Sequence, residues 1–186
     1  MTDFKLYDRL GNQIKSHDHN DRATWYETGS SLEQEFLEKH GKELGYIANP
    51  EKLTDVMAVD MVDIYKRKKA DLKTLNTPLF IAHKKYHLDP RHTVTFTTKD
   101  RTRYNNIHKD IDIVFWVDWK AVRMEGMYYS ISIEPLYAVY VITMADINAL
   151  CEVAILHNNP SRVDVVKNSK AAYLLDVRMP QFTRLI

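Results

Sequence analysis

Two aspartates and a lysine stand at spacings that could serve phosphate chemistry. Asp60 lies in "DVMAVDMVDIY" (residues 55–65), and Asp71 and Lys73 form an Asp-x-Lys triplet in "KADLKTL" (residues 69–75). If both runs are strands of one hairpin, Asp71 and Lys73 share a face and Asp60 lies across from them. Two carboxylates can hold Mg²⁺, and a nearby lysine can orient the metal-bound water or offset negative charge on a phosphate. The three residues therefore predict phosphodiester hydrolysis.

A helix predicted upstream supplies a third carboxylate. In "SSLEQEFLEKHGKEL" (residues 30–44) apolar residues recur at helical spacing and Ser30 can cap the first turn. Glu35 and Glu38 each have a lysine four residues on, as on a solvated face, whereas Glu33 lies beside the apolar stripe. Ser30 and Glu33 also have capping-box spacing, and that role can coexist with a role in the site. The stripe consists of Leu32, Phe36, Leu37 and Leu44.

The order of these elements resembles the core of the PD-(D/E)xK nuclease superfamily. A helix with a glutamate, a strand with an aspartate and a strand with Asp-x-Lys correspond here to Glu33, to Asp60, and to Asp71 with Lys73. The resemblance spans residues 28–120, although no proline precedes Asp60. The run "LKTLNTPLF" also resembles the stretch that follows the lysine in several phage and restriction-type members.

The resemblance implies a fold, an activity and a cofactor. The fold would be an α/β (α+β) fold with a restriction-endonuclease-like central mixed β-sheet flanked by helices. The activity would be metal-dependent hydrolysis of DNA, with Mg²⁺ as the ion and Mn²⁺ as its substitute. Asp60 and Asp71 would bind the metal, Glu33 would assist the metal or the water, and Lys73 would act on the water or the transition state. Whether two chains pair to cut both strands stays open.

Asp-x-Lys alone is a weak signal, because the chain also contains Asp3-x-Lys5 and Asp118-x-Lys120. The last of these stands in "DIDIVFWVDWK", where apolar and polar residues alternate as in a half-exposed strand. It also lacks an upstream aspartate at hairpin distance, so we expect a structural role for it. For the triplet that begins at Asp71, the alternative interpretation is an exposed ladder of salt bridges.

Periodicity along the rest of the chain predicts a central sheet with flanking helices. A turn near Lys66 and Arg67 joins the two runs that carry the aspartates. Apolar residues at helical spacing predict a second helix over residues 144–157. Further strands are predicted over residues 93–99, 110–119, 128–133, 137–142 and 171–177.

Length and composition limit the class of protein. The chain has 186 residues, of which 45% are hydrophobic, and a formal net charge of +1. We expect a polar N-terminal arm over residues 1–27, anchored by Trp25 and Tyr26, and one domain over residues 28–186. The N-terminus lacks a secretory pattern, no apolar run approaches the ~20 residues that span a bilayer, and the single Cys151 excludes an intramolecular disulfide. These features favour a cytoplasmic protein without a membrane segment.

Cations gather in the middle of the chain, where a polyanion could bind. The segment "TTKDRTRYNNIHK" (residues 97–109) places Lys99, Arg101 and Arg103 beside Tyr104. We expect these three cations to contact nucleic-acid phosphates and Tyr104 to be able to stack on a base. A solvated basic loop is the alternative. A second strip of phosphate contacts is predicted at Arg162, Lys167 and Lys170.

Histidine and cysteine patterns indicate no further chemistry. His83 and His87 have a spacing that could bind zinc on a helix, but a lysine replaces the glutamate of the metalloprotease motif. His17 and His19 have no companion cysteines. Cys151 lies within "NALCEVAIL", which favours a buried core residue over a nucleophile.

Three functions agree with these patterns. The first is a metal-dependent endodeoxyribonuclease. The second is a catalytically inactive nucleic-acid-binding protein of the same fold. The third is a structural or interaction protein of a phage or mobile element, in which the charged hairpin is only surface. Metal-dependent nicking separates the first from the others, and salt-sensitive binding without cleavage indicates the second.

Overall fold

The largest sheet of this protein has six strands in the order β13-β10-β7-β5-β4-β3. The computed structural model describes residues 4–14, 31–55, 57–158 and 171–186. Within them the chain forms a mixed α+β structure, which confirms the predicted α/β class. The six strands are β3 (Tyr46–Ala48), β4 (Met61–Asp63), β5 (Lys68–Leu75), β7 (Asp112–Asp118), β10 (Tyr137–Thr143) and β13 (Thr183–Arg184).

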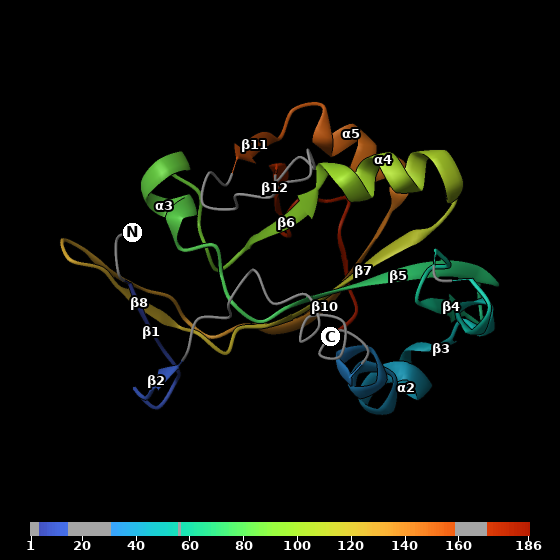
Figure 1. Ribbon diagram of the computed structural model, residues 1–186, viewed down its shortest axis with the longest axis horizontal. Coiled ribbons are helices and arrows are strands. Elements are labelled where there is room, and N and C mark those ends of the chain that lie inside the picture. The colour runs from blue at the N-terminus through green and yellow to red at the C-terminus, as the bar shows by residue number, and fades with distance from the viewer. Residues whose placement is uncertain (1–3, 15–30, 56, 159–170) are drawn as a thin grey trace.

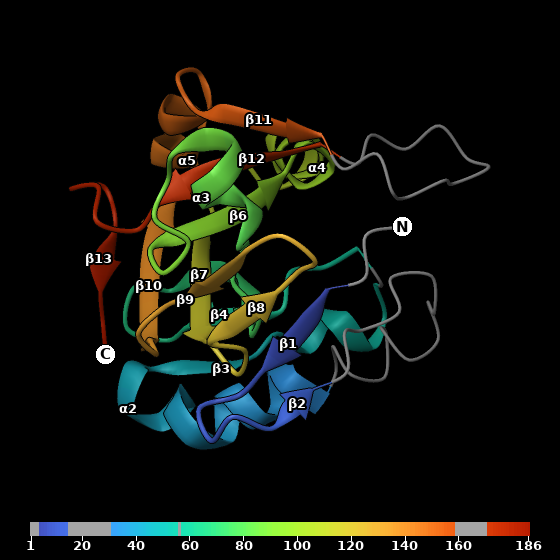
Figure 2. The same ribbon diagram turned by 90° about the vertical axis from the view of Figure 1, so that its left-hand side faces the viewer.

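Helices cover both faces of this sheet. Figure 1 and Figure 2 show α4 and α5 on one side of β5, β7 and β10, and α2 on the other side. A three-stranded sheet, in the order β11-β12-β6, lies with α4 and α5. These elements are α2 (Lys42–Leu44), α4 (Thr98–Ile107), α5 (Met144–Cys151), β6 (Thr93–Thr97), β11 (Ile155–Asn158) and β12 (Ala171–Asp176).

β5 and β7 run parallel, and this pairing determines what covers Asp71 and Lys73. Parallel neighbours need a crossover connection, and here it contains α3 (Ile81–Tyr86), β6 and α4. Asp71 pairs with Ile113, which belongs to the same buried cluster as Tyr104 of α4. The crossover therefore places α4 over the face of β5 that carries Asp71 and Lys73.

The β4–β5 hairpin has the predicted turn, which the chain makes at residues 64–67. Asp63 Oδ1 accepts hydrogen bonds from the backbone N–H groups of Tyr65 and Lys66, both at 2.9 Å. Arg67 completes the turn with a φ of 53°. The local bonds of one aspartate thus help to set the register of the hairpin.

The first strand of this hairpin is shorter than predicted. Upstream of β4, Pro50–Leu53 form the 3-10 helix η2, and Ala58 N–H bonds to the Asp55 carbonyl (3.1 Å) in a turn. Asp60 lies at a bend directly before β4. The prediction of a strand over residues 55–65 is therefore wrong at residues 55, 57–60, 64 and 65, where local turns replace the extended chain; residue 56 lies outside the described residues.

The predicted helix over residues 30–44 is present wherever the structure describes it. Residues 31–36 are helical, η1 (Leu37–Gly41) is a wider π-helical segment, and α2 ends at Gly45 with a φ of 79°. A Cβ at Gly41 would lie 2.8 Å from the Tyr46 carbonyl oxygen, so only glycine permits this approach. The apolar stripe packs as predicted, with Phe36 buried beside Trp116 and Leu32, Leu37 and Leu44 around them. Ser30 lies outside the described residues.

The prediction of a half-exposed strand over residues 110–119 is wrong, because all of β7 is buried. Phe115 packs in the cluster on the side of α4, while Val114 and Trp116 pack against Phe36 on the other side. The helix over residues 31–44 covers the face that alternation had assigned to solvent. Asp112, at the start of β7, is buried with Lys68 Nζ at 2.7 Å from its Oδ1.

Two further segments differ from their predictions. The strand predicted over residues 93–99 ends at Thr97, because Thr97 Oγ1 caps α4 by accepting a hydrogen bond from the Asp100 N–H (3.0 Å). The alternative of a solvated basic loop over residues 97–109 is wrong, since α4 occupies most of that segment. The helix predicted over residues 144–157 ends at Cys151, because the chain then turns and pairs with β12 as β11.

The N-terminal hairpin belongs to a third sheet, in the order β2-β1-β8-β9. Its strands are β1 (Lys5–Tyr7), β2 (Gln13–Ile14), β8 (Arg123–Glu125) and β9 (Ser130–Ser132), which lie side by side in Figure 2. Lys5–Tyr7 of the predicted arm therefore pair with β8 of the body, and Gln13–Ile14 pair with β1. Trp25 and Tyr26 lie outside the described residues. None of the described helices has the length and apolar character needed to cross a membrane.

Candidate active site

The hairpin brings Asp60 beside Asp71, as predicted. Met61 pairs with Ala70 in the β4–β5 ladder, so the next position along sets Asp60 against Asp71. β4 begins only at Met61, and Asp60 Oδ2 accepts the hydrogen bond of the Leu72 N–H (3.0 Å) in place of a strand partner. Burial raises the pKa of Asp71, and the negative charge of Asp60 adds to this increase. The two carboxylates therefore interact.

Lys73 neutralises the more buried of these carboxylates. Its Nζ lies 2.9 Å from Asp71 Oδ2, and the Asp71 side chain is only 4% exposed. Burial acts to lower the pKa of Lys73, but the charge of Asp71 and the neighbouring Tyr104 and Asp100 raise it well above its ordinary value. The lysine is thus a fixed cation at neutral pH. The predicted exposed salt-bridge ladder is excluded for this pair by its burial.

α4 adds Asp100, Arg103 and Tyr104 to the acidic site; the sequence had predicted nucleic-acid contacts for the last two and no role for Asp100. Lys73 Nζ lies 3.1 Å from Asp100 Oδ2 and donates to the Tyr104 hydroxyl at 2.9 Å. Arg103 Nη2 lies 3.4 Å from Asp71 Oδ1 and also donates to the Tyr104 hydroxyl at 2.5 Å. The available signal was the Thr97-x-x-Asp100 cap, which predicts a helix start and places Asp100 and Arg103 one turn apart.

Glu33 reaches Asp60 through a lysine of η2. Lys52 Nζ lies 2.7 Å from Asp60 Oδ1 and also donates a hydrogen bond to Glu33 Oε2. Burial raises the pKa of Glu33, the bond from Lys52 opposes this, and the charges of Asp60 and Asp71 raise it further. No local pattern could have identified Lys52, which is 19 residues from Glu33 and 8 from Asp60.

The four predicted catalytic residues thus form two ion-paired groups that meet at Asp60. Asp71 and Lys73 lie on the sheet face under α4, whereas Glu33 comes from the helix that covers the opposite face. Asp60 contacts both groups, through Lys52 on one side and the backbone of β5 on the other. Electrostatic coupling joins all three carboxylates.

The predicted nucleic-acid contacts lie on different sides of α4. Tyr104 is 0% exposed and packs near Phe96, so the prediction that its ring stacks on a base is wrong. Arg103 adjoins the site, while Arg101 points to the other side of α4 and donates to Asn148 Oδ1 at 3.0 Å. Lys99 is exposed. The predicted second strip, Arg162, Lys167 and Lys170, lies outside the described residues.

The alternative triplet Asp118-x-Lys120 stands apart from this site. Asp71 aligns with Ile113 on β7, and Asp118 lies five residues farther along, which is about 16 Å at the rise of a strand. Asp118 pairs with Lys120 and has Arg9 Nη2 at 3.6 Å from its Oδ1. These contacts agree with the expected structural role. Asp3 of the third triplet lies outside the described residues.

Cys151 is buried, as predicted. Burial raises the pKa of its thiol to about 11. Among the described residues, no three His, Cys, Asp or Glu side chains group as a metal site. His83 lies in α3 and His87 follows it with a φ of 57°. His17 and His19 lie outside the described residues.

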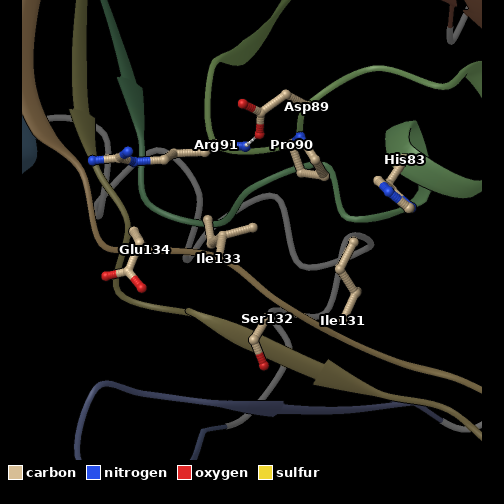
Figure 3. A pocket seen from close by; sticks show the side chains of 8 residues that line it. All are labelled: His83, Asp89, Pro90, Arg91, Ile131, Ser132, Ile133 and Glu134. Carbon is tan, nitrogen blue, oxygen red and sulfur yellow. Dashed lines mark hydrogen bonds between the residues drawn. The ribbon is translucent and has the colours of Figure 1, made fainter.

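An open pocket between the α3–β6 connection and β9 contains no part of the acidic site. Figure 3 shows His83 and Glu134 on opposite sides of it. Asp89, on its upper side in this view, accepts a hydrogen bond from the Arg91 N–H at 3.0 Å. The pocket is lined by His83, Asp89, Pro90, Arg91, Ile131, Ser132, Ile133 and Glu134.

The oxygen ligands at the acidic site suit a hard divalent cation. Mg²⁺ prefers carboxylate oxygens and keeps part of its water shell, and Asp60, Asp71 and Glu33 supply such oxygens. The ammonium of Lys52 between Glu33 and Asp60 shows that this position accommodates positive charge. Glu33 and Asp60 could hold the ion in place of the Lys52 ammonium, because Mg²⁺ needs only one or two carboxylates beside its waters. Within the described residues Glu33, Asp60 and Asp71 do not group as a single three-carboxylate metal site, and Asp71 keeps Lys73 as its partner.

Comparison with known proteins provides no relative for this chain. No family model matches it, and neither the curated proteins nor the solved structures contain a match.

Proposed function

We propose that this protein is a metal-dependent endodeoxyribonuclease with a restriction-endonuclease-like core. The observation that carries the proposal is the meeting of Glu33, Asp60, Asp71 and Lys73. They come from a helix, the start of a hairpin and its second strand, in the order of the PD-(D/E)xK resemblance. A chance Asp-x-Lys on a surface hairpin would not account for a glutamate that reaches the same place from the opposite face of the sheet.

The residues divide the work of phosphodiester hydrolysis. Asp60 and Asp71, with Glu33, would hold Mg²⁺, which when bound supplies an activated water and positive charge beside the phosphate. Lys73 stays protonated, because its pKa is raised, so it offsets the negative charge that develops on the phosphate and does not accept a proton. Tyr104 fixes the position of the Lys73 ammonium by accepting its hydrogen bond.

DNA binding would rest on cations near this site. Arg103 is partly exposed and adjoins Asp71, so its guanidinium can contact a phosphate beside the scissile bond. Lys99 lies one turn before Arg103 on the same helix and is exposed to solvent. Arg101 would join them only from the other side of α4, where Asn148 and Tyr173 hold it.

A second candidate is a nucleic-acid-binding protein that does not cleave. It is favoured by one observation, which is that Lys52 and Lys73 already neutralise the three carboxylates. In that case the same residues serve stability, and Asp60 serves as the partner of the Leu72 N–H. The two candidates differ in whether the chain binds a divalent cation.

The test is cleavage of supercoiled plasmid DNA by the purified protein with Mg²⁺, Mn²⁺ or EDTA. We expect nicking with either metal and none with EDTA. Asp60→Asn should reduce nicking at least about 100-fold, because the amide keeps an oxygen for the Leu72 N–H but loses the charge that a metal needs. Glu51→Gln is the matched control, since Glu51 lies in the same region, is exposed and pairs with Lys69 instead.

Equal nicking by wild type and Asp60→Asn would refute the proposed site. Salt-sensitive DNA binding without nicking in any metal would establish the second candidate.

A further inference from the structure

Lys52 occupies a position between two carboxylates of the proposed metal site. Its Nζ bonds to Asp60 Oδ1 at 2.7 Å and to Glu33 Oε2. Both bonds involve only the terminal ammonium, which is the group that a divalent cation would replace. The lysine therefore competes with metal for the same oxygens.

The two lysines of the site differ in how firmly they are held. Lys73 is 20% exposed and contacts Asp71, Asp100 and Tyr104, all within 3.1 Å. The side chain of Lys52 is 34% exposed and begins from η2, a single short helical turn. A rotamer change can carry the Lys52 ammonium into water, whereas Lys73 would have to break a buried network. Lys52 is thus the cation that can leave.

We propose that Lys52 is an exchangeable counter-ion, which holds Glu33 and Asp60 in the metal-free protein and is displaced when a divalent cation binds. This inference rests on the proposed function and adds a residue that sets the metal affinity of the site. The Lys52 ammonium and a metal ion are both positive and cannot occupy the same oxygens, so the bound ammonium weakens metal binding. Without metal, the ammonium reduces the repulsion between the carboxylates of Glu33 and Asp60. Removal of the ammonium should strengthen metal binding.

The first test measures Mn²⁺ binding directly, without DNA, from the electron paramagnetic resonance signal of free Mn²⁺. We expect Lys52→Met to bind Mn²⁺ about tenfold more tightly than wild type, a typical size for coupling between two ligands of one site. Lys69→Met is the matched control and should bind as wild type does, because Lys69 pairs with the exposed Glu51 at 2.6 Å. Asp60→Asn should lose most of the binding.

The second test needs no variant and so does not depend on whether Lys52→Met folds. Amine acetylation of the wild-type protein, read by mass spectrometry, reports how accessible each lysine is. Saturating Mn²⁺ should speed the labelling of Lys52 several-fold and leave Lys69 unchanged, because only the former is expelled from an ion pair. Lys73 should stay protected in both states.

The outcomes separate this inference from the proposed function. Suppose that wild type binds Mn²⁺, that Lys52→Met binds it with the same affinity, and that Mn²⁺ leaves the acetylation rate of Lys52 unchanged. The exchange is then refuted, and the proposed metal site stands. If neither wild type nor Lys52→Met binds Mn²⁺, Lys52 is a permanent structural bridge, and both the inference and the metal-dependent function are refuted.

Discussion

Replacing Lys73 with methionine should destabilise the fold, because it leaves the most buried carboxylate of the site short of a cation. Asp71 would lose its partner at 2.9 Å and keep only Arg103 at 3.4 Å. Removing one member of a buried ion pair costs about 3–5 kcal/mol of folding free energy. Because Arg103 remains beside Asp71, we expect a loss at the lower end, about 3 kcal/mol. Asp100, which is more exposed, can turn to water and adds little.

Equilibrium unfolding in urea, followed by far-ultraviolet circular dichroism, measures this loss. With a slope of about 2 kcal/mol per molar urea, a loss of about 3 kcal/mol lowers the unfolding midpoint by about 1.5 M. Lys69→Met is the control, since that lysine is on the same strand but pairs with an exposed glutamate. It should change the free energy of unfolding by less than about 0.5 kcal/mol.

A double-mutant cycle attributes the effect to the pair. The double variant Asp71→Asn/Lys73→Met should be more stable than the sum of the two single losses predicts, by about 1–3 kcal/mol. Each single variant leaves one charge of the pair without its partner, whereas the double variant removes both charges. The reasoning is refuted if Lys73→Met is as stable as Lys69→Met, or if the single losses simply add.

Two further predictions concern residues outside the site. Asp118→Asn and Lys120→Ala should retain metal-dependent nicking within about twofold, because Asp118 lies about 16 Å along β7 from the level of Asp71 and Lys120 follows it. Loss of nicking with unchanged thermal stability would assign the active site to that triplet instead. Cys151 should react with a thiol reagent at pH 8 at least about 100-fold more slowly in the native protein than in guanidinium. The side chain is buried, and a pKa of about 11 leaves about one native thiol in a thousand ionised at pH 8. Similar rates in the two states would show that the helix around Cys151 opens readily.

The elements that local patterns describe well are those whose partners are near in the sequence. The helix over residues 31–44 follows from apolar residues at a period of 3.6, and the β4–β5 turn follows from the charged break that ends one apolar run. Asp71 and Lys73 are two residues apart on one strand, and this separation alone sets both side chains on the same face. A hairpin then brings Asp60 to them, so most of the candidate site could be predicted from the sequence.

Tertiary contacts decided what the patterns could not. Alternation in β7 predicted an exposed face, but the helix around Phe36 arrives from 80 residues upstream and buries it. The sequence did not predict α4, because Tyr104 is its one fully buried side chain and a single residue produces no apolar period. The parallel β5–β7 crossover sets this helix over Lys73. Lys52 reaches Glu33 across 19 residues and Asp60 across 8, and neither separation corresponds to a helix or strand period, so sequence spacing could not indicate these ion pairs.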